Sequence, residues 1–125
     1  MKTIVYTTQA PAPIGPYSQA VLMNDTLFVS GQIAINPATS DLVLTDIISE
    51  THQVMSNLKA ILTEAGFEWA QVVKTSIFVK DLNNFATINE VYGTYFTTQA
   101  PARETVEVSR LPKDVNVEIS CIAAR

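Results

Sequence analysis

The chain has very little cysteine and histidine and no long hydrophobic run. With one cysteine among 125 residues, Cys121, no disulfide can form within the chain, and we expect this thiol to be a small buried side chain. One cysteine and one histidine, His52, cannot supply the usual ligands of a zinc site. No apolar segment approaches the roughly 20 residues that cross a bilayer, and Met1–Thr8 lacks the apolar stretch of a signal peptide. We therefore expect a cytoplasmic protein with no metal ion and no membrane segment.

Positive charge is also scarce. Eight Lys and Arg residues stand against twelve Asp and Glu residues, which gives a net charge of −4 and an isoelectric point near 4.8. Proteins that bind nucleic acid cluster their basic residues, whereas those of this chain are spread along its length. Neither a G-x-x-x-x-G-K-[ST] nor a G-x-G-x-x-G motif occurs. These absences argue against a nucleic-acid partner and against a nucleotide cofactor, and we expect no cofactor of any kind.

Apolar residues are abundant and lie in short, patterned segments. They make up 47% of the chain, and its length suffices for one core, so we predict a single domain over residues 1–125. Six segments have the alternation or the β-branched composition of strands. They are Ile4–Tyr6, Tyr17–Met23, Leu27–Gly31, Val72–Val79, Thr105–Ser109 and Val115–Cys121. Asn24 and Asp25 predict a tight hairpin turn between the second and third of these.

Two further segments have the three- and four-residue spacing of amphipathic helices. The first begins after Asp46, which suits an N-cap, and ends before Gly66, which suits a C-terminal stop. The second is expected to be capped by Asn84 and to run to about Phe96. The order β-β-β-α-β-α-β-β predicts an α+β fold, with a mixed six-stranded sheet and both helices packed on one face.

The segment between Pro101 and Ile119 contains the side chains best suited to ligand binding or catalysis. Arg103 follows a proline turn, and a guanidinium can hold a carboxylate with a planar fork of donors. We predict that the two strands of this segment pair around the turn Leu111–Asp114. Glu118 then lies on a polar sheet face, where a carboxylate can orient water or transfer protons. Glu107 is a rival that could lie across this hairpin from Glu118, and the pattern alone does not decide between them.

The sheet face away from the helices is expected to be polar, with several valines among its polar residues. Its predicted polar residues are Ser30, Lys74 or Thr75, Glu107 and Glu118. Such a face suits neither a dry core nor an ordinary solvated surface, so we expect a partner to cover it. An arginine held near a carboxylate there could bind a small carboxylic acid.

The chain also resembles the Rid family, the YjgF-like deaminases of reactive imines and enamines. The resemblance rests on Pro101-Ala102-Arg103 and the following Leu-Pro-Lys-Asp turn and Val-Glu-Ile strand, and on four earlier blocks in the family's order. Those blocks are Ile14–Ala20, Val29–Ile33, Val73–Thr75 and Val79–Asn83. Together they cover essentially the whole chain.

The resemblance implies a chorismate-mutase-like fold, in which three copies close their sheets into a barrel with ligand clefts between neighbours. It implies hydrolysis, without a cofactor, of 2-imino and enamine acids such as 2-aminoacrylate, 2-iminopropanoate and 2-iminobutanoate to 2-keto acids and ammonia. In the family, the arginine that matches Arg103 grips the substrate carboxylate, and the motif favours Glu118 for the proton transfers. The matching blocks also make substrate-binding candidates of five more residues, namely Tyr17, Ser30, Gly31, Asn89 and Thr105.

Two positions depart from the family pattern. Where many members have a small residue and then cysteine, this chain has Glu104 and Thr105. A role that needs a thiol is therefore absent, although a role of the backbone at Thr105 would survive. Glu104 adds a negative charge next to Arg103, which would weaken anion binding unless it points away. These departures keep an alternative open, namely a non-catalytic protein that binds or senses 2-keto acids.

Overall fold

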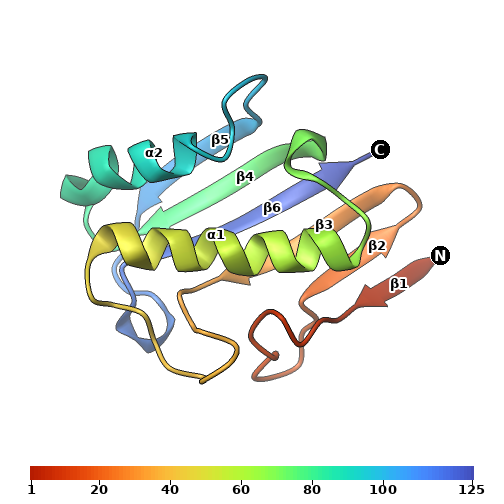
Figure 1. Ribbon diagram of the computed structural model, residues 1–125, viewed down its shortest axis with the longest axis horizontal. Coiled ribbons are helices and arrows are strands. Elements are labelled where there is room, and N and C mark those ends of the chain that lie inside the picture. The colour runs from red at the N-terminus through yellow and green to blue at the C-terminus, as the bar shows by residue number, and fades with distance from the viewer.

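Six strands form one mixed sheet, and two helices cover one of its faces (Figure 1). The computed structural model describes residues 1–125. The strands are β1 (Lys2–Val5), β2 (Ala20–Met23), β3 (Thr26–Gln32), β4 (Val72–Val79), β5 (Ala102–Glu107) and β6 (Val117–Ala124). They lie in the order β1-β2-β3-β6-β4-β5, and all neighbours are antiparallel except β4 and β5. The predicted α+β class and the order of elements are confirmed.

The predicted turn and caps of the first half of the chain are present. Asn24 adopts a φ of 55° in the turn that joins β2 to β3. The first helix, α1, spans Ile47–Glu64, and the carboxylate of Asp46 accepts a hydrogen bond from the backbone N–H of Ser49 at 2.7 Å. Gly66 follows the helix with a φ of 80°, a conformation that glycine adopts without steric cost. These features are local, so the residue types alone predict them.

The second helix is shorter than predicted and begins differently. The helix, α2, spans Phe85–Gly93 and stops before Phe96, because Gly93 is a poor helix former. Asn84 makes no capping hydrogen bond through its side chain. A short 3-10 turn precedes the helix, and Asp81 caps that turn by accepting from the backbone N–H of Asn83 at 2.9 Å.

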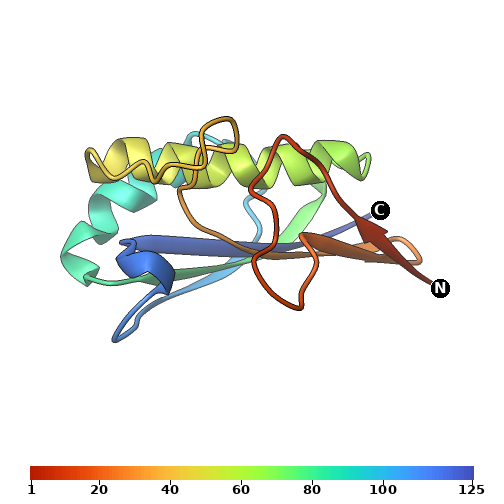
Figure 2. The same cartoon turned by 90° about the horizontal axis from the view of Figure 1, so that it is seen from below.

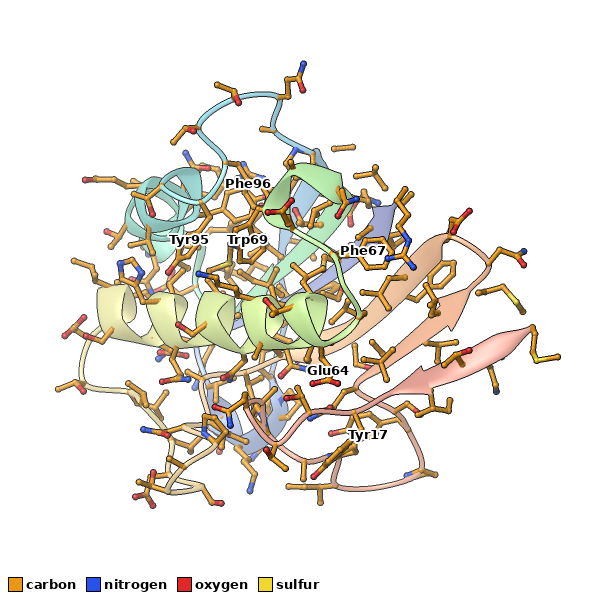
Figure 3. The ribbon with its side chains drawn as sticks, turned by 45° about the vertical axis from the view of Figure 1, so that its right-hand side comes forward. Tyr17, Glu64, Phe67, Trp69, Tyr95 and Phe96 are labelled. Atoms are coloured by element: carbon orange, nitrogen blue, oxygen red, sulfur yellow. The ribbon has the colours of Figure 1, made fainter.

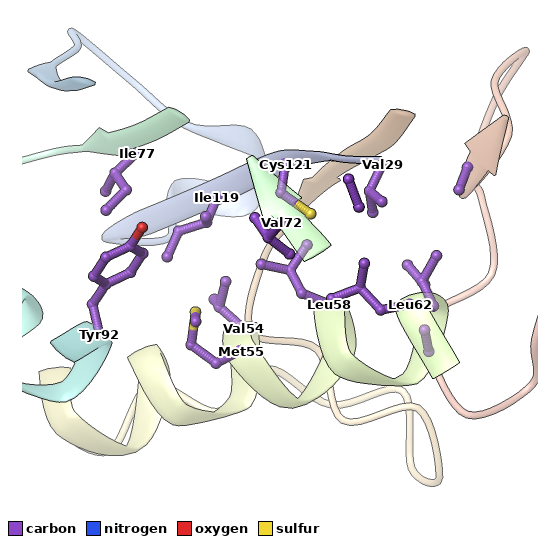
Figure 4. Close-up of a cluster of buried hydrophobic side chains, with 14 of the residues drawn as sticks. Val29, Val54, Met55, Leu58, Leu62, Val72, Ile77, Tyr92, Ile119 and Cys121 are labelled. Atoms are coloured by element: carbon purple, nitrogen blue, oxygen red, sulfur yellow. The ribbon is translucent and has the colours of Figure 1, made fainter. Parts of the chain in front are cut away.

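The hydrophobic core lies between the helices and the sheet (Figure 4). Val54, Leu58 and Leu62 of α1 face the sheet and are almost fully buried. Ile119 and Cys121 project from β6 toward them, which confirms the expected burial of the single thiol. Burial raises the pKa of the Cys121 thiol to about 12, so the group stays protonated and inert. Neither helix has the length and apolarity needed to cross a bilayer.

The predicted pairing of the last two strands is wrong. β4 lies between β5 and β6 and pairs with both. The unit β4–α2–β5 is a crossover that joins two parallel strands, and residues 108–116 then lead past the end of β4 to β6. Glu107 therefore does not face Glu118. Its carboxylate instead accepts a hydrogen bond from the backbone N–H of Leu82 at 2.9 Å, near the start of α2.

The sheet face away from the helices is uncovered, and we call it the open face (Figure 2). Strand alternation and register bring together on it the apolar residues Ile4, Val21, Phe28, Ile122, Phe78 and Val106 and the polar residues Lys74, Ser76, Glu104, Glu118 and Ser120. Phe28 is 47% exposed and Val106 is 41% exposed. Apolar and polar side chains therefore share the open face.

Of the two candidates Lys74 and Thr75, Lys74 projects from the open face, and Thr75 is buried on the helix side, where its hydroxyl lies 2.7 Å from the Tyr92 hydroxyl. The assignment of Glu107 to this face was wrong. Glu107 lies on the same side of β5 as Arg103, which packs against α2. Val106 projects from the open face, on the side of β5 opposite to Glu107. Alternation separates the two faces of a strand, but it does not say which face meets the helices.

Candidate functional site

A hollow of about 550 Å³ lies at the end of the sheet, near the N-terminal loop. It is formed by residues 11–19, by the end of β3 and the residues after it, by the turn before β6 and by β6 itself. Four of the predicted site residues line it, namely Tyr17, Ser30, Gly31 and Glu118. They come from three separate segments of the chain, so the fold brings them together.

Glu118 is the only carboxyl group that lines this hollow. Its neighbours Val117 and Ile119 are fully buried against the helices, so its own side chain projects from the open face, where it is half-buried. Burial raises the pKa of the Glu118 carboxyl above its ordinary value, and no nearby cation opposes this shift. A carboxyl whose pKa is raised toward neutrality both accepts and returns protons more readily at physiological pH.

Gly31 keeps the space for this carboxylate open. A Cβ added at position 31 would lie 2.9 Å from Cδ of Glu118 and closer still to Oε2. The strand register shifts between Val29 and Gln32, which marks an irregularity of β3 at this point. The irregularity and the missing side chain together let the carboxylate of β6 lie directly against the backbone of β3.

Ser30 lies next to Gly31 and is held firmly. Its hydroxyl donates to the carbonyl of Ser18 at 2.6 Å, and its backbone N–H donates to the carbonyl of Gln19 at 2.9 Å. The hydroxyl proton is therefore already used, and the oxygen remains available as an acceptor for a ligand.

The loop that carries Tyr17 is anchored by a buried glutamine that the sequence analysis missed. The side chain of Gln19 accepts from the backbone N–H of Thr7 at 2.7 Å and donates to the carbonyls of Thr7 and Pro11 at 3.0 and 2.9 Å. Tyr17 lies at the edge of the molecule and is 53% exposed, and Ile14 donates its backbone N–H to the Tyr17 hydroxyl at 3.3 Å (Figure 3). The aromatic ring is thus placed at the mouth of the hollow.

Arg103 lies elsewhere, on the helix side of the sheet. Its guanidinium donates to the side-chain carbonyl of Asn89 at 2.7 Å and lies 5.1 and 5.7 Å from the ring centroids of Tyr92 and Phe85. These three residues belong to α2, and Tyr92 follows Asn89 by three positions, so they share one helix face. The sequence alone did not reveal that the Arg103 guanidinium contacts the rings of Tyr92 and Phe85. These contacts orient the planar fork of donors before any ligand arrives.

The structure does not bring Arg103 and Glu118 together within one chain. Glu118 projects from the open face, whereas Arg103 packs against α2 on the opposite face. The two groups therefore belong to two half-sites. The first is Tyr17, Ser30, Gly31 and Glu118; the second is Arg103 with Asn89 and its aromatic neighbours. β5, which carries Arg103, is an edge strand.

The residues at the two departures from the family pattern lie on opposite sides of β5. Glu104 faces away from Arg103, accepts a short hydrogen bond from the Ser76 hydroxyl and lies 2.9 Å from the ammonium of Lys74. The Ser76 hydrogen bond and the Lys74 charge lower the pKa of the Glu104 carboxyl. Its charge is therefore compensated and directed away from the guanidinium. Thr105 shares the helix side with Arg103, and its buried hydroxyl has no hydrogen-bond partner.

No group of three His, Cys, Asp or Glu side chains is arranged to hold a metal ion. The single histidine, His52, is exposed on α1, and its Nδ1 lies 2.7 Å from the Tyr95 hydroxyl. It does not line the hollow.

With this geometry in view, the chain belongs to the Rid (YjgF-like) family. The family described as Endoribonuclease L-PSP matches residues 7–125. A RutC family protein of Pyrococcus horikoshii is 52% identical over 123 residues, which cover 98% of each chain. The predicted family membership is thus confirmed.

Two solved structures extend the comparison. The Rid family protein YyfA of Yersinia pestis is 49% identical, superposes with a TM-score of 0.97, and is covered fully by this chain, as this chain is by it. TdcF of Escherichia coli, solved with bound serine, is 42% identical with a TM-score of 0.94 over 98% of each chain. The chain is thus similar to these proteins in its whole fold, and not in isolated motifs alone.

Proposed function

We propose that the protein hydrolyses 2-imino acids and their enamine tautomers to 2-keto acids and ammonia, at sites assembled from two copies of the chain. Arg103 of one copy and Glu118 of the next would face each other across the interface. The observation that carries the proposal is the carboxyl of Glu118, which has a raised pKa and lies in a hollow that Gly31 keeps clear. The serine held by the similar TdcF has the carboxylate and the nitrogen that such a substrate also has.

The open face supports an assembly of several copies. Exposed apolar side chains of the open face, among them Ile4, Phe28 and Val106, would remain in water on a single chain, and exposed apolar surface of this kind often marks an interface. A homotrimer in which the sheets close into a barrel would cover this face. A ring of identical, head-to-tail contacts would also bring the edge strand β5 of one copy against the open face of another.

The proposed reaction needs only positioning and proton transfer. Arg103 holds the substrate carboxylate through the N–H groups that Asn89 leaves free. Glu118 accepts a proton from a water molecule, whose oxygen adds to the imine carbon. Glu118 then returns this proton to the nitrogen, which gives a carbinolamine. Glu118 next takes the proton of the new hydroxyl and delivers it to the amino nitrogen, so that the C–N bond breaks, ammonia leaves and the keto group forms. The backbone carbonyl of Thr105 is a candidate acceptor for the substrate nitrogen.

A coupled assay tests the activity. Threonine dehydratase with threonine supplies 2-iminobutanoate, a trapping amine competes for it, and the release of 2-oxobutanoate is followed. We expect the protein to accelerate this release, and Arg103→Ala to lower the acceleration by roughly a hundredfold or more. Arg125→Ala is the matched control, because Arg125 lies against Phe67 at the C-terminus and is expected to be dispensable. Full activity of Arg103→Ala would refute the mechanism.

A mixing experiment tests whether each site uses two copies. Arg103→Ala and Glu118→Ala are each expected to be inactive. In a ring of three formed at random from equal amounts of both, about a quarter of the interfaces pair an intact Arg103 with an intact Glu118. Co-expression with two different tags should therefore restore roughly a quarter of the wild-type activity. No recovery in verified mixed assemblies would contradict a shared site.

The alternative function is that of a binding protein that senses 2-keto acids. Position 105 supports this alternative, because it holds threonine where many family members have cysteine. The same assay separates the two functions. Binding of 2-oxobutanoate without any acceleration of its release would support the sensor. Cleavage of RNA has less support, because the chain is acidic and Lys113 is the only basic residue lining the hollow.

A further inference from the structure

The turn between β5 and β6 holds two consecutive residues in an unfavourable backbone conformation. Lys113 has φ 56° and ψ 22°, and Asp114 has φ 56°, although neither is a glycine. The left-handed region is sterically costly for residues with a Cβ and persists only where the surroundings enforce it. Such strain at the edge of a candidate site suggests that the turn serves the site.

Two sets of contacts hold this turn in place. The guanidinium of Arg110 donates to both carboxylate oxygens of Asp114, at 2.9 and 3.4 Å. On the inner side, the fully buried carboxylate of Glu50 accepts from the backbone N–H and the side-chain N–H of Asn116, both at 2.7 Å. Glu50 is a buried charged group that the proposed reaction does not use. Its contacts fix the chain immediately after the strained residues.

These contacts hold the backbone that positions the ammonium group of Lys113. Lys113 lines the hollow that contains Glu118, and it also lines an adjoining hollow of about 470 Å³. Lys113 and Glu118 are the only charged residues in the lining of either hollow. Lys113 forms no ion pair, and burial alone sets the raised pKa of Glu118, so the ammonium is not paired with that carboxylate. Lys113 is thus an unpaired cation between two adjoining hollows that share part of their lining.

We infer that Lys113 binds a second anionic group of the ligand, so that the site favours dicarboxylic 2-imino and 2-keto acids over monocarboxylic ones. This inference rests on the proposed function, in which Arg103 of a neighbouring copy takes the first carboxylate. The main hollow of about 550 Å³ lies in the range of sites for ligands much larger than a three- or four-carbon acid, roughly 300–1,000 Å³. A longer acid can therefore extend from Glu118 toward Lys113.

Two probes of equal chain length test the inference by calorimetry. 2-Oxoglutarate and 2-oxopentanoate differ only in that one ends in a carboxylate and the other in a methyl group. We expect the wild-type assembly to bind 2-oxoglutarate roughly five- to tenfold more tightly. Lys113→Gln should remove this preference and leave the affinity for 2-oxopentanoate unchanged, whereas Lys113→Arg should keep it. Lys59→Gln is the control, because it removes the same charge from α1, outside both hollows.

The outcomes distinguish this inference from the proposed function. Equal binding of both probes by the wild type, or an equal loss of both on Lys113→Gln, would overturn the role of Lys113 and leave the imine hydrolase standing. Failure of both probes to bind, with no acceleration in the coupled assay, would overturn both proposals. Loss of the preference on Lys59→Gln would show a general charge effect and would also overturn the inference.

Discussion

Gly31 and Glu118 work as one unit, because the carboxylate fills the space that a side chain at position 31 would need. The strand pattern predicted that Glu118 lies on the open face, since its neighbours in β6 are apolar. Its closeness to Gly31 could not be read from the pattern, because the two residues are far apart in sequence and meet only through the pairing of β3 with β6.

Gly31→Ala is expected to displace the Glu118 carboxylate and lower the rate of imine hydrolysis by roughly a hundredfold. Stability should change by less than about 1 kcal/mol, because the backbone φ of Gly31 is not positive and the clash is with a movable side chain. The coupled assay and thermal unfolding measure the two effects.

Gly93→Ala is the control for this substitution. A Cβ there has no neighbour within 4 Å, and Gly93 is the last residue of α2, so alanine should keep activity and stabilise the helix by up to about 1 kcal/mol. An active Gly31→Ala protein would show that the carboxylate does not need its observed position.

Glu118→Gln is expected to abolish activity and raise thermal stability at neutral pH. Since the pKa of Glu118 is raised in the folded protein, the stability it contributes is present below its ordinary pKa and is lost as pH rises through the raised value. Glutamine stays neutral and avoids this loss. Melting temperatures measured from about pH 4 to about pH 8 should coincide at the acid end and diverge toward neutrality. Parallel curves would contradict the raised pKa.

At the scale of elements, caps and turns followed from local residue types, whereas the pairing of the last strands did not. Asp46, Asn24 and Gly66 act within a few residues of their own positions, and each does what its residue type predicts. The neighbours of β5 depend on α2, which folds back and makes β5 parallel to β4. A crossover of this kind depends on how the helix packs on the sheet, and the alternation within a strand contains no information about it.

The strained turn before β6 leads to a prediction about this element. Lys113→Gly should stabilise the protein by about 0.5–1 kcal/mol, because glycine adopts the left-handed conformation without steric cost and loses only part of that gain to chain entropy. Lys113→Ala loses the same charge but keeps the strain, so it should give no such gain. Thermal or urea unfolding compares the two variants. Equal stability would show that the backbone of the turn is not strained.

At the scale of the whole molecule, the open face is the surface of a single chain on which exposed apolar side chains have no covering element. The ion pair of Lys74 with Glu104 lies on β4 and the edge strand β5, and apolar residues of the other strands share the face with it. The proposed assembly would cover this surface with another copy and would bring Arg103 of one copy to Glu118 of the next.

Phe28→Glu is expected to convert the proposed trimer to monomers and to abolish activity, because it puts an unpaired charge in the middle of the covered face. Light scattering after gel filtration measures the mass, and the coupled assay measures the activity. Ile48→Glu is the matched control, because Ile48 is similarly exposed, at 51%, but lies in the first turn of α1 on the helix side. An active, trimeric Phe28→Glu protein would contradict the proposed interface.

The amino-acid sequence by itself determined the class of fold, the N-cap of α1, the burial of Cys121 and the membership of the Rid family. These properties follow from local periodicity, from residue type and from motifs that stand in the family's order along the chain. Only the tertiary structure decided that β4 separates β5 from β6, that Arg103 and Glu118 lie on opposite faces, and that Lys113 is presented at the hollow. Each of these depends on contacts between segments distant in sequence, which form only when helices and strands pack in three dimensions.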